Sequence, residues 1–280
     1  MSYSDVLDKI VWSYSSVNSY QNCPRCFFLE RIQKVEKVQN AFAEWGSFMH
    51  SILERYFKGE IDIFDLLDVY EKEYKRRVQC AFPFNKYADL SSRYYEAGLN
   101  YLSNFNGLSP KFEILGIEDQ AILTIGSRKF IGYIDLILRH KDTKSIVIVD
   151  HKSKSGFKNQ KELNEYLRQL YLYSLYVKEK YGEYPESLMF NMMRAGDKVN
   201  HLFSEDRLNE SVDWFLSTID LIYSDLKFED KISIEYERKF KDISTYHPGD
   251  DFFCSALCGA RNFCERSGCM KSSQNEQDFF

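Results

Sequence analysis

The stretch from Gly132 to Lys152 constrains the fold of this chain more than any other. It holds two apolar runs, 131–138 and 146–149, and both are rich in the β-branched residues that buried strands favour. The segment between them, 140–145, is short and polar, so it predicts a tight connection between two strands. We expect the rest of the chain to be organised around this strand pair.

Each of the two predicted strands carries an acidic residue that a protein core would exclude. Asp135 lies within the first strand, and Asp150 lies at the end of the second. Lys152 follows Asp150 by two positions, and the alternation of side chains along a strand places both on one face. The two carboxylates at the ends of buried strands offer the oxygen ligands that a divalent cation prefers. The ammonium of Lys152 would then lie beside the bound cation. A solvated strand end is the alternative interpretation, because such triplets also occur by chance.

Composition narrows the class of protein. The chain has 280 residues, of which 44 % are hydrophobic, and this is ample for a core. It has no run near the ~20 apolar residues of a membrane helix and no signal-peptide pattern, so we expect a soluble, cytoplasmic protein of a prokaryotic or virus-infected cell. A net charge of −5 argues against binding nucleic acid through bulk charge. A local basic excess follows the proposed centre, at Lys152, Lys154, Lys158, Lys161 and Arg168.

The seven cysteines are unevenly placed. In the absence of a secretion signal, a disulfide framework is not expected. Clustering near both ends of the chain suggests metal ligands instead. Cys80, within a predicted helix, is interpreted as a packed thiol. The others are Cys23, Cys26, Cys254, Cys258, Cys264 and Cys269.

Periodicity predicts the order of helices and strands. Apolar residues at helical spacing predict helices over about 13–22, 47–58, 63–78, 91–104, 161–181 and 205–228. Alternating or continuous apolar runs predict strands over 112–117, 121–125, 128–137, 146–149, 187–193 and 199–203. Gly126-Ser127 is a typical hairpin turn. The order of hairpins, crossover helix, strands and helix predicts an α/β core with a mixed sheet.

The acid in the first strand, followed by Asp150-His151-Lys152 in the place of (D/E)-x-K, resembles the PD-(D/E)xK nuclease superfamily. Three further motifs make the chain similar to the RecB-type branch, close to CRISPR-associated RecB-like exonucleases and the AddB nuclease domain. They are Tyr14 to Cys23-Pro24 near the start, Gly46-x-x-x-His50 opening a helix, and Gln169-x-x-x-Tyr173 on another helix. The resemblance covers roughly residues 13–264.

The resemblance implies an α/β PD-(D/E)xK core whose mixed sheet is flanked by helices. It implies a single RecB-like nuclease domain over 1–270, with a helical insert at about 45–107 and a catalytic core at about 111–230. A cysteine-rich segment at 246–270 would join the N-terminal cysteines in a metal staple. The polar tail, 271–280, is expected to be disordered.

The resemblance also implies the site residues. His50, Asp135, Asp150 and the backbone carbonyl of His151 would bind Mg²⁺ or Mn²⁺, which activates water for hydrolysis. Lys152 would orient that water or stabilise the transition state. Gln169 would position Lys152 or the phosphate, and Tyr173 would contact the strand or the hydrogen bonds of the site. The implied catalytic residues are thus Asp135, Asp150, Lys152, Gln169 and Tyr173, with Glu118, Tyr166 and His151 as secondary candidates.

Iron–sulfur members of the family hold a [4Fe–4S] cluster with one N-terminal and three C-terminal cysteines. Cys23, Cys254, Cys258 and Cys264 occupy the corresponding positions in this chain. The first C-terminal spacing is three residues where the common pattern has two, so Cys26 or Cys269 stays an alternative ligand. Four thiolates also suit zinc, and a site without metal is the third possibility.

These features predict a divalent-metal-dependent DNA exonuclease. It would hydrolyse phosphodiester bonds in single-stranded DNA or at DNA ends, in recombination, repair, replication or a CRISPR-like process. The alternative is a nuclease-fold DNA-binding subunit that serves a protein partner, although binding alone does not require the complete set of His50, Asp135, Asp150 and Lys152. A restriction-type endonuclease ranks third, because it leaves the terminal cysteines unexplained.

Overall fold

The computed structural model describes residues 3–226 and 252–264. Its backbone contacts divide the chain into two compact units. The sheet unit comprises Ala41–Leu123 and Phe130–Val212, and the terminal unit comprises Met1–Asn40, Thr124–Lys129 and Asp213–Phe280. The predictions for Cys269, for residues 227–230, 246–251 and 265–270, and for the tail at 271–280 lie outside the described residues.

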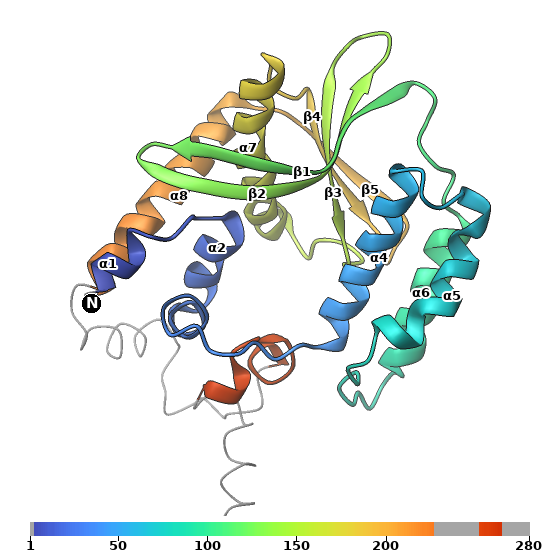
Figure 1. The fold of residues 1–280 in the computed structure, drawn as a ribbon, viewed down its shortest axis with the longest axis horizontal. Coiled ribbons are helices and arrows are strands. Elements are labelled where there is room, and N and C mark those ends of the chain that lie inside the picture. The colour runs from blue at the N-terminus through green and yellow to red at the C-terminus, as the bar shows by residue number, and fades with distance from the viewer. Residues whose placement is uncertain (1–2, 227–251, 265–280) are drawn as a thin grey trace, which may run out of the picture. The chain divides into compact units, whose positions relative to one another are not determined.

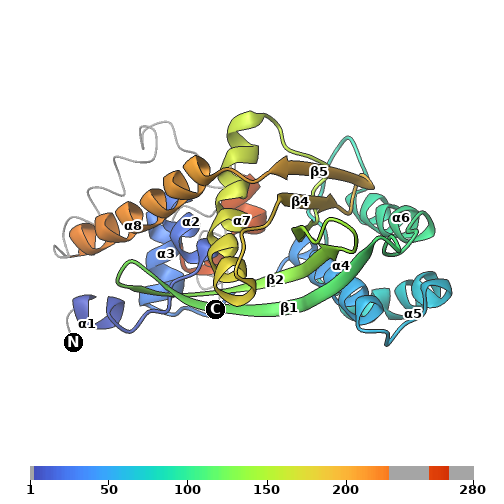
Figure 2. The ribbon, with the colours of Figure 1, turned by 90° about the horizontal axis from the view of Figure 1, so that it is seen from above.

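Five strands form one mixed sheet, in the spatial order β1-β2-β3-β4-β5. The strands are β1 Phe112–Ile125, β2 Arg128–His140, β3 Ile146–Lys152, β4 Ser187–Met192 and β5 Asp197–Leu202. β2 and β3 are antiparallel, β3 and β4 are parallel, and β4 and β5 are antiparallel. The parallel step is made by helix α7, Gln160–Tyr181, which packs on one face of β3 and β4 (Figure 2). The predicted α/β class with a mixed sheet and flanking helices is confirmed.

The central strand β3 is buried along almost its whole length, and only its last residue is partly exposed. Its two faces have different surroundings. Val147 and Val149 pack with Leu136 and Leu138 of β2 in an apolar cluster. The alternate residues Ile146, Ile148 and Asp150 face the other way. A strand covered on both sides reads as a continuous apolar run, which is why this one is plain in the sequence.

Further helices belong to the sheet unit. They are α4 Ala41–Phe57, the short 3₁₀ turn Ile63–Asp65, α5 Leu66–Arg77 and α6 Leu90–Ser103. Figure 1 shows α5 and α6 side by side, with α4 next to them. Their core contains the buried rings of Trp45, Phe48, Tyr70 and Tyr94. Gly98 on α6 permits this packing, because a Cβ there would lie 2.2 Å from the Tyr70 hydroxyl oxygen.

Two details of this helical part differ from prediction. Helix α4 begins at Ala41 rather than at Ser47, because the extra turns bury Ala41 and Trp45. Cys80 lies beyond the end of α5, in a loop and not in a helix. There its backbone N–H donates to Glu44 Oε2 over 2.7 Å, and its thiol donates to Glu44 Oε1 over 3.1 Å.

The terminal unit contains short helices and part of a long one. They are α1 Tyr3–Leu7, α2 Tyr14–Asn22, α3 Pro24–Phe27, π-helical turns at Phe28–Ile32 and Phe253–Leu257, and a 3₁₀ turn at Arg261–Phe263. Helix α8, Glu205–Leu226, enters this unit at Asp213. Ser13 caps α2 through a reciprocal capping box with Ser16. The Trp12 and Phe27 rings stack at 6.1 Å between their centroids and form part of the core. Across 3–226 and 252–264, no helix has the length and apolarity to cross a membrane.

Candidate active site

The β2–β3 pairing brings two acidic residues to one place in the sheet. Leu136 pairs with Val149, so Asp135 and Asp150 are the next residues on the two antiparallel strands. Asp150 is only 4 % exposed. A buried carboxylate requires a partner, since leaving an ion without one in the interior costs several kcal/mol, by a rough estimate.

Lys152 is that partner. Its Nζ lies 2.6 Å from Asp150 Oδ2, and both side chains are largely buried. Burial raises the pKa of Asp150 above its usual value, and the Lys152 ammonium opposes that shift. The rings of Tyr166 and Phe190 lie 5.4 Å and 5.8 Å from the same Nζ, at cation–π distances. These contacts therefore hold the ammonium in place, and it does not extend into water.

Helix α7 continues this arrangement through hydrogen bonds. Lys152 Nζ donates to Gln169 Oε1 over 3.0 Å, and Gln169 Nε2 donates to the Tyr173 hydroxyl over 2.9 Å. Gln169 and Tyr173 are one helical turn apart, so they lie on the same side of α7. Gly132 on β2 makes room for the ring of Tyr173, because a Cβ there would lie 2.3 Å from it. The Q-x-x-x-Y motif thus fixes the position of the lysine.

Helix α4 supplies an imidazole to the same region. Gly46 allows the helix to approach the end of β3, since a Cβ there would lie 3.3 Å from the Ser153 side chain. His50 follows one turn later on the same face of the helix. Its Nδ1 lies 3.6 Å from Asp135 Oδ2. The G-x-x-x-H spacing therefore has a physical reason: the glycine brings the helix close enough for the histidine to reach the strand.

Glu118 joins His50 and Asp135, although sequence reasoning ranked it as secondary. Among residues 3–226 and 252–264, they form the one group of three or more His, Cys, Asp or Glu residues whose possible ligand atoms all lie within 4.8 Å of one another. Burial, followed by the charge of Asp135, raises the pKa of Glu118 to about 7. An imidazole and crowded carboxylates form a donor set that fits Mg²⁺ or Mn²⁺, since a cation would relieve the repulsion between the acids.

The backbone at Glu118 corrects one prediction. The two strands predicted at 112–117 and 121–125 are a single strand, β1. Glu118 interrupts its regularity with a φ of 47°. That left-handed conformation costs a non-glycine residue about 1–2 kcal/mol, and such strain is concentrated at functional sites. In the sequence, Glu118 is an acid at the junction of two alternating runs, and the family resemblance made it a secondary candidate.

The backbone and the side chain of His151 make contacts on opposite faces of the sheet. Its backbone N–H donates to Asp135 Oδ2 over 2.6 Å, whereas its side chain points to the face opposite Asp150. There the imidazole Nδ1 lies 2.9 Å from Asn191 Nδ2, and its ring is parallel to that of Phe57. Burial lowers the pKa of His151 to about 3, so the ring is neutral. The family resemblance implies that the backbone carbonyl of His151 binds the metal. In the structure, it is the backbone N–H of His151 that contacts the site, through Asp135.

The raised pKa of Glu118 predicts a measurable effect on stability. Its folded-state pKa of about 7 lies above the ordinary 4.5, so folding favours the protonated form. This contribution is complete below the ordinary value and is lost as pH rises through about 7. In EDTA, we expect Glu118→Gln to melt a few degrees above wild type at about pH 8 and equally at about pH 4, below the ordinary value. Glu113→Gln, an exposed change on the same strand, is the control. Equal melting of Glu118→Gln and wild type at both pH values would contradict the effect.

The cysteines at both ends of the chain meet in the terminal unit. Cys23, Cys26, Cys258 and Cys264 are buried in one cluster, and Cys254 is also buried. Cys26 Sγ lies 3.6 Å from Cys258 Sγ. Burial raises the pKa of Cys23 to about 12, and charges on Cys264, Cys254 and Cys258 add to this shift. No three sulfurs of the described residues meet the 4.8 Å limit, whereas tetrahedral zinc with Zn–S bonds of ~2.3 Å would hold all four within about 4 Å.

Comparison with known proteins assigns the chain to a family. A family model of the PD-(D/E)XK nuclease superfamily matches residues 11–265. A crystal structure from Eubacterium rectale that bears the name "Putative exonuclease" is similar in fold, with 11 % sequence identity and a TM-score of 0.44. That similarity covers 75 % of this chain and 79 % of the other. No curated protein matches the chain.

Proposed function

Because the chain belongs to the PD-(D/E)XK nuclease superfamily, we propose that it is a divalent-metal-dependent DNA exonuclease of the RecB-type branch. The observation that carries this proposal is the approach of His50, Glu118 and Asp135 beside the buried ion pair of Asp150 and Lys152. Single-stranded DNA and DNA ends are the proposed substrates, in recombination, repair, replication or a CRISPR-like process.

The metal would be held by His50, Glu118, Asp135 and Asp150, with the His151 carbonyl as a further proposed ligand. When bound, Mg²⁺ or Mn²⁺ lowers the pKa of water and offsets charge on the scissile phosphate. The imidazole in the set favours Mn²⁺ somewhat over Mg²⁺. Asp150 contributes even though it is outside the 4.8 Å group, because the charges of Asp135 and His50 both act on it.

Lys152 supplies the other half of the chemistry. Its ammonium is held by Asp150 Oδ2 on one side and Gln169 Oε1 on the other. A cation fixed in this way costs no reorganisation when negative charge grows on a phosphate oxygen. Lys152 therefore stabilises that charge or orients the attacking water, while Gln169 and Tyr173 act as positioning residues.

The direct test compares two forms of one single-stranded DNA. Pure protein is incubated with end-labelled linear DNA and with covalently closed circular DNA, in Mn²⁺ or in EDTA. We expect Mn²⁺-dependent shortening of the linear form and survival of the circles, because an exonuclease requires an end. Cutting of the circles would indicate an endonuclease. A rise in melting temperature with Mn²⁺, without turnover of either DNA, would instead favour the DNA-binding subunit.

His50→Ala is expected to weaken Mn²⁺ binding at least about tenfold, because removing groups that only orient a metal ligand already costs 10–100-fold. Isothermal titration calorimetry of the metal alone measures the change, so the readout does not depend on activity. His140→Ala is the matched control: His140 is the last residue of β2, and its ring packs on Phe112. Equal Mn²⁺ affinity in His50→Ala and wild type would remove His50 from the metal site.

We also propose that Cys23, Cys254, Cys258 and Cys264 hold a [4Fe–4S] cluster. Support comes from their gathering around one buried region of the terminal unit and from their separation, which exceeds that of a zinc site. An iron–sulfur cluster interposes sulfide ions and so spreads its cysteines further apart. Such a centre would join residues 23–26 to residues 254–264 as a staple. Cys26 is then a neighbour of the ligands and not one of them.

A further inference from the structure

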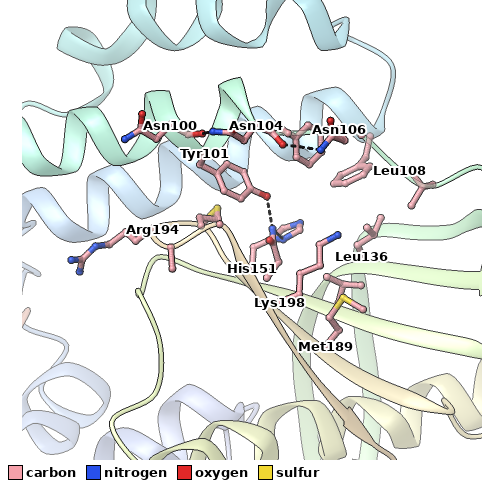
Figure 3. A pocket seen from close by; sticks show the side chains of 18 of the residues that line it. Asn100, Tyr101, Asn104, Asn106, Leu108, Leu136, His151, Met189, Arg194 and Lys198 are labelled. Carbon is pink, nitrogen blue, oxygen red and sulfur yellow. Dashed lines mark hydrogen bonds between the residues drawn. The ribbon is translucent and has the colours of Figure 1, made fainter.

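The sheet unit contains a cavity of about 600 Å³ that the proposed chemistry does not use. It lies between helix α6 and the face of β2, β3 and β4 that carries Val149 and His151 (Figure 3). Asp150 and Lys152 point to the opposite face of the sheet. The volume falls within the roughly 300–1,000 Å³ of ligand sites. His151 is the one residue among the proposed site residues that lines it.

The lining divides into an apolar floor and a polar rim. The floor is made of sheet residues: Leu136, Leu138, Val147, Val149 and Met189. The rim carries Arg93, Glu96, Arg194 and Lys198, three basic residues to one acidic residue. Figure 3 shows Lys198 directed into the space between Leu108 and His151. An apolar surface next to a basic rim suits a ligand with an apolar ring and a negative charge.

Buried polar groups that line the cavity are placed to form hydrogen bonds with the edge of such a ring. Asn191 Nδ2 lies 2.6 Å from the Tyr101 hydroxyl and 2.9 Å from His151 Nδ1, so one amide group contacts both. In this arrangement, Asn191 Oδ1 and the Tyr101 O–H stay available to a ligand within the described part of the chain. A carbonyl acceptor next to a hydroxyl donor is complementary to the edge of a nucleobase.

The cavity adjoins the candidate metal site through His151. The imidazole of His151 lines the cavity, and its backbone N–H binds Asp135. The rings of His50 and His151 lie 5.7 Å apart between centroids. Phe57, two turns after His50 on α4, stacks on His151 and also lines the cavity. A group bound in the cavity would therefore be one residue away from the metal ligands.

From these observations, we propose that the cavity binds a nucleotide, with its base on the apolar floor and its phosphate toward Lys198. Two sources share this chemistry: a nucleotide of the substrate strand next to the scissile phosphate, and a free nucleoside monophosphate. The first source rests on the proposed nuclease function, and the binding chemistry itself does not.

Direct titration tests the cavity without reference to activity. The full chain in EDTA is titrated with each deoxynucleoside 5′-monophosphate, and with deoxyribose 5-phosphate as the probe that lacks a base. We expect the nucleotides to bind and the sugar phosphate to bind at least about tenfold more weakly. Lys198→Glu is expected to weaken nucleotide binding by a similar factor, whereas Lys75→Glu, the same charge change on exposed α5, is not. Ala97→Trp fills the cavity from α6 and should abolish binding, with melting temperature as the check on folding.

An abasic residue at the cleavage position separates the two sources. Slower digestion of that DNA, with a raised KM, places a strand nucleotide in the cavity. Unchanged digestion together with nucleotide binding assigns the cavity to a free nucleotide. If no nucleotide binds wild type while DNA is still digested, the cavity proposal is overturned and the nuclease stands. If nucleotides bind but no DNA is digested, the cavity proposal stands and the proposed nuclease function fails.

Discussion

Lys152→Met is expected to lower the rate of DNA hydrolysis by about 10²–10³-fold, the usual effect of removing one charge-stabilising donor. Methionine keeps most of the length of the side chain and its contacts with Tyr166 and Phe190, but it removes the ammonium. The charge that grows on the phosphate in the transition state then has no fixed cation from this position. We expect kcat to fall while KM stays close to wild type, because the lost interaction is made in the transition state alone.

The same substitution has a structural consequence that must be separated from the chemical one. Asp150 loses the ammonium 2.6 Å from its Oδ2, and a buried carboxylate without its partner destabilises the fold. In EDTA, burial then favours the neutral acid, so the variant should lose less stability at low pH than at high pH. Melting curves measure this effect, and the rate is compared only at temperatures where the variant is folded.

Lys154→Met is the matched control for Lys152→Met. Lys154 follows two residues later and pairs with Glu162 Oε1 at 2.5 Å, so the change removes an equal charge and an equal ion pair. We expect its hydrolysis rate to stay within about threefold of wild type, since partly exposed pairs of this kind contribute little. Hydrolysis by Lys152→Met at the wild-type rate would show that Lys152 is not catalytic. Equal losses in both variants would point to general electrostatic attraction of DNA.

The centre of the fold was readable from the sequence because local rules determine it. The apolar runs of β2 and β3 and the polar connection between them specify an antiparallel pair. Strand alternation then places Asp150 and Lys152 on one face, and their ion pair follows from that alone. In the same way, helical spacing places Gln169 and Tyr173 on one side of α7. In each case the partners are a few residues apart, so the periodicity of one element decides their geometry.

Features that depend on packing between distant segments were not readable in this way. Glu118 lies near His50 and Asp135 and has a left-handed backbone conformation within β1. The periodicity of the sequence does not predict that conformation. Asn191 approaches His151 because β4 pairs with β3 in parallel, and that register is set by the crossover of α7. The position of Cys26 against Cys258 joins residues 232 positions apart. Such contacts arise from tertiary structure, and sequence alone supplied only the residue types.

Cys258→Ser is expected to remove the iron of anaerobically purified protein, with its visible colour, and to lower the melting temperature by roughly 10 °C. In the described residues, the cysteine cluster links the segment of Cys23 to that of Cys258, far apart in the chain. Burial keeps the pKa of Cys23 high, so without a metal this thiol stays protonated and makes weak contacts, whereas the adjacent Cys26 thiol lowers the pKa of Cys258 to about 7. A bound centre would replace these contacts with metal–thiolate bonds. Because the centre would bind the folded chain far more strongly than the unfolded chain, it would stabilise the fold.

Two matched serine substitutions decide which cysteines are ligands. Cys80→Ser changes a thiol that contacts Glu44 in the sheet unit, so it should keep the iron and the wild-type melting temperature. Cys26→Ser is the sharper comparison, because Cys26 lies beside Cys258 but is proposed not to bind the metal. Iron retained in Cys26→Ser and lost in Cys258→Ser supports the four proposed ligands. The reverse result would make Cys26 the ligand in place of Cys258. Stoichiometric zinc in wild type, with no iron, would overturn the cluster while leaving the staple, because both metals bind the same thiolates.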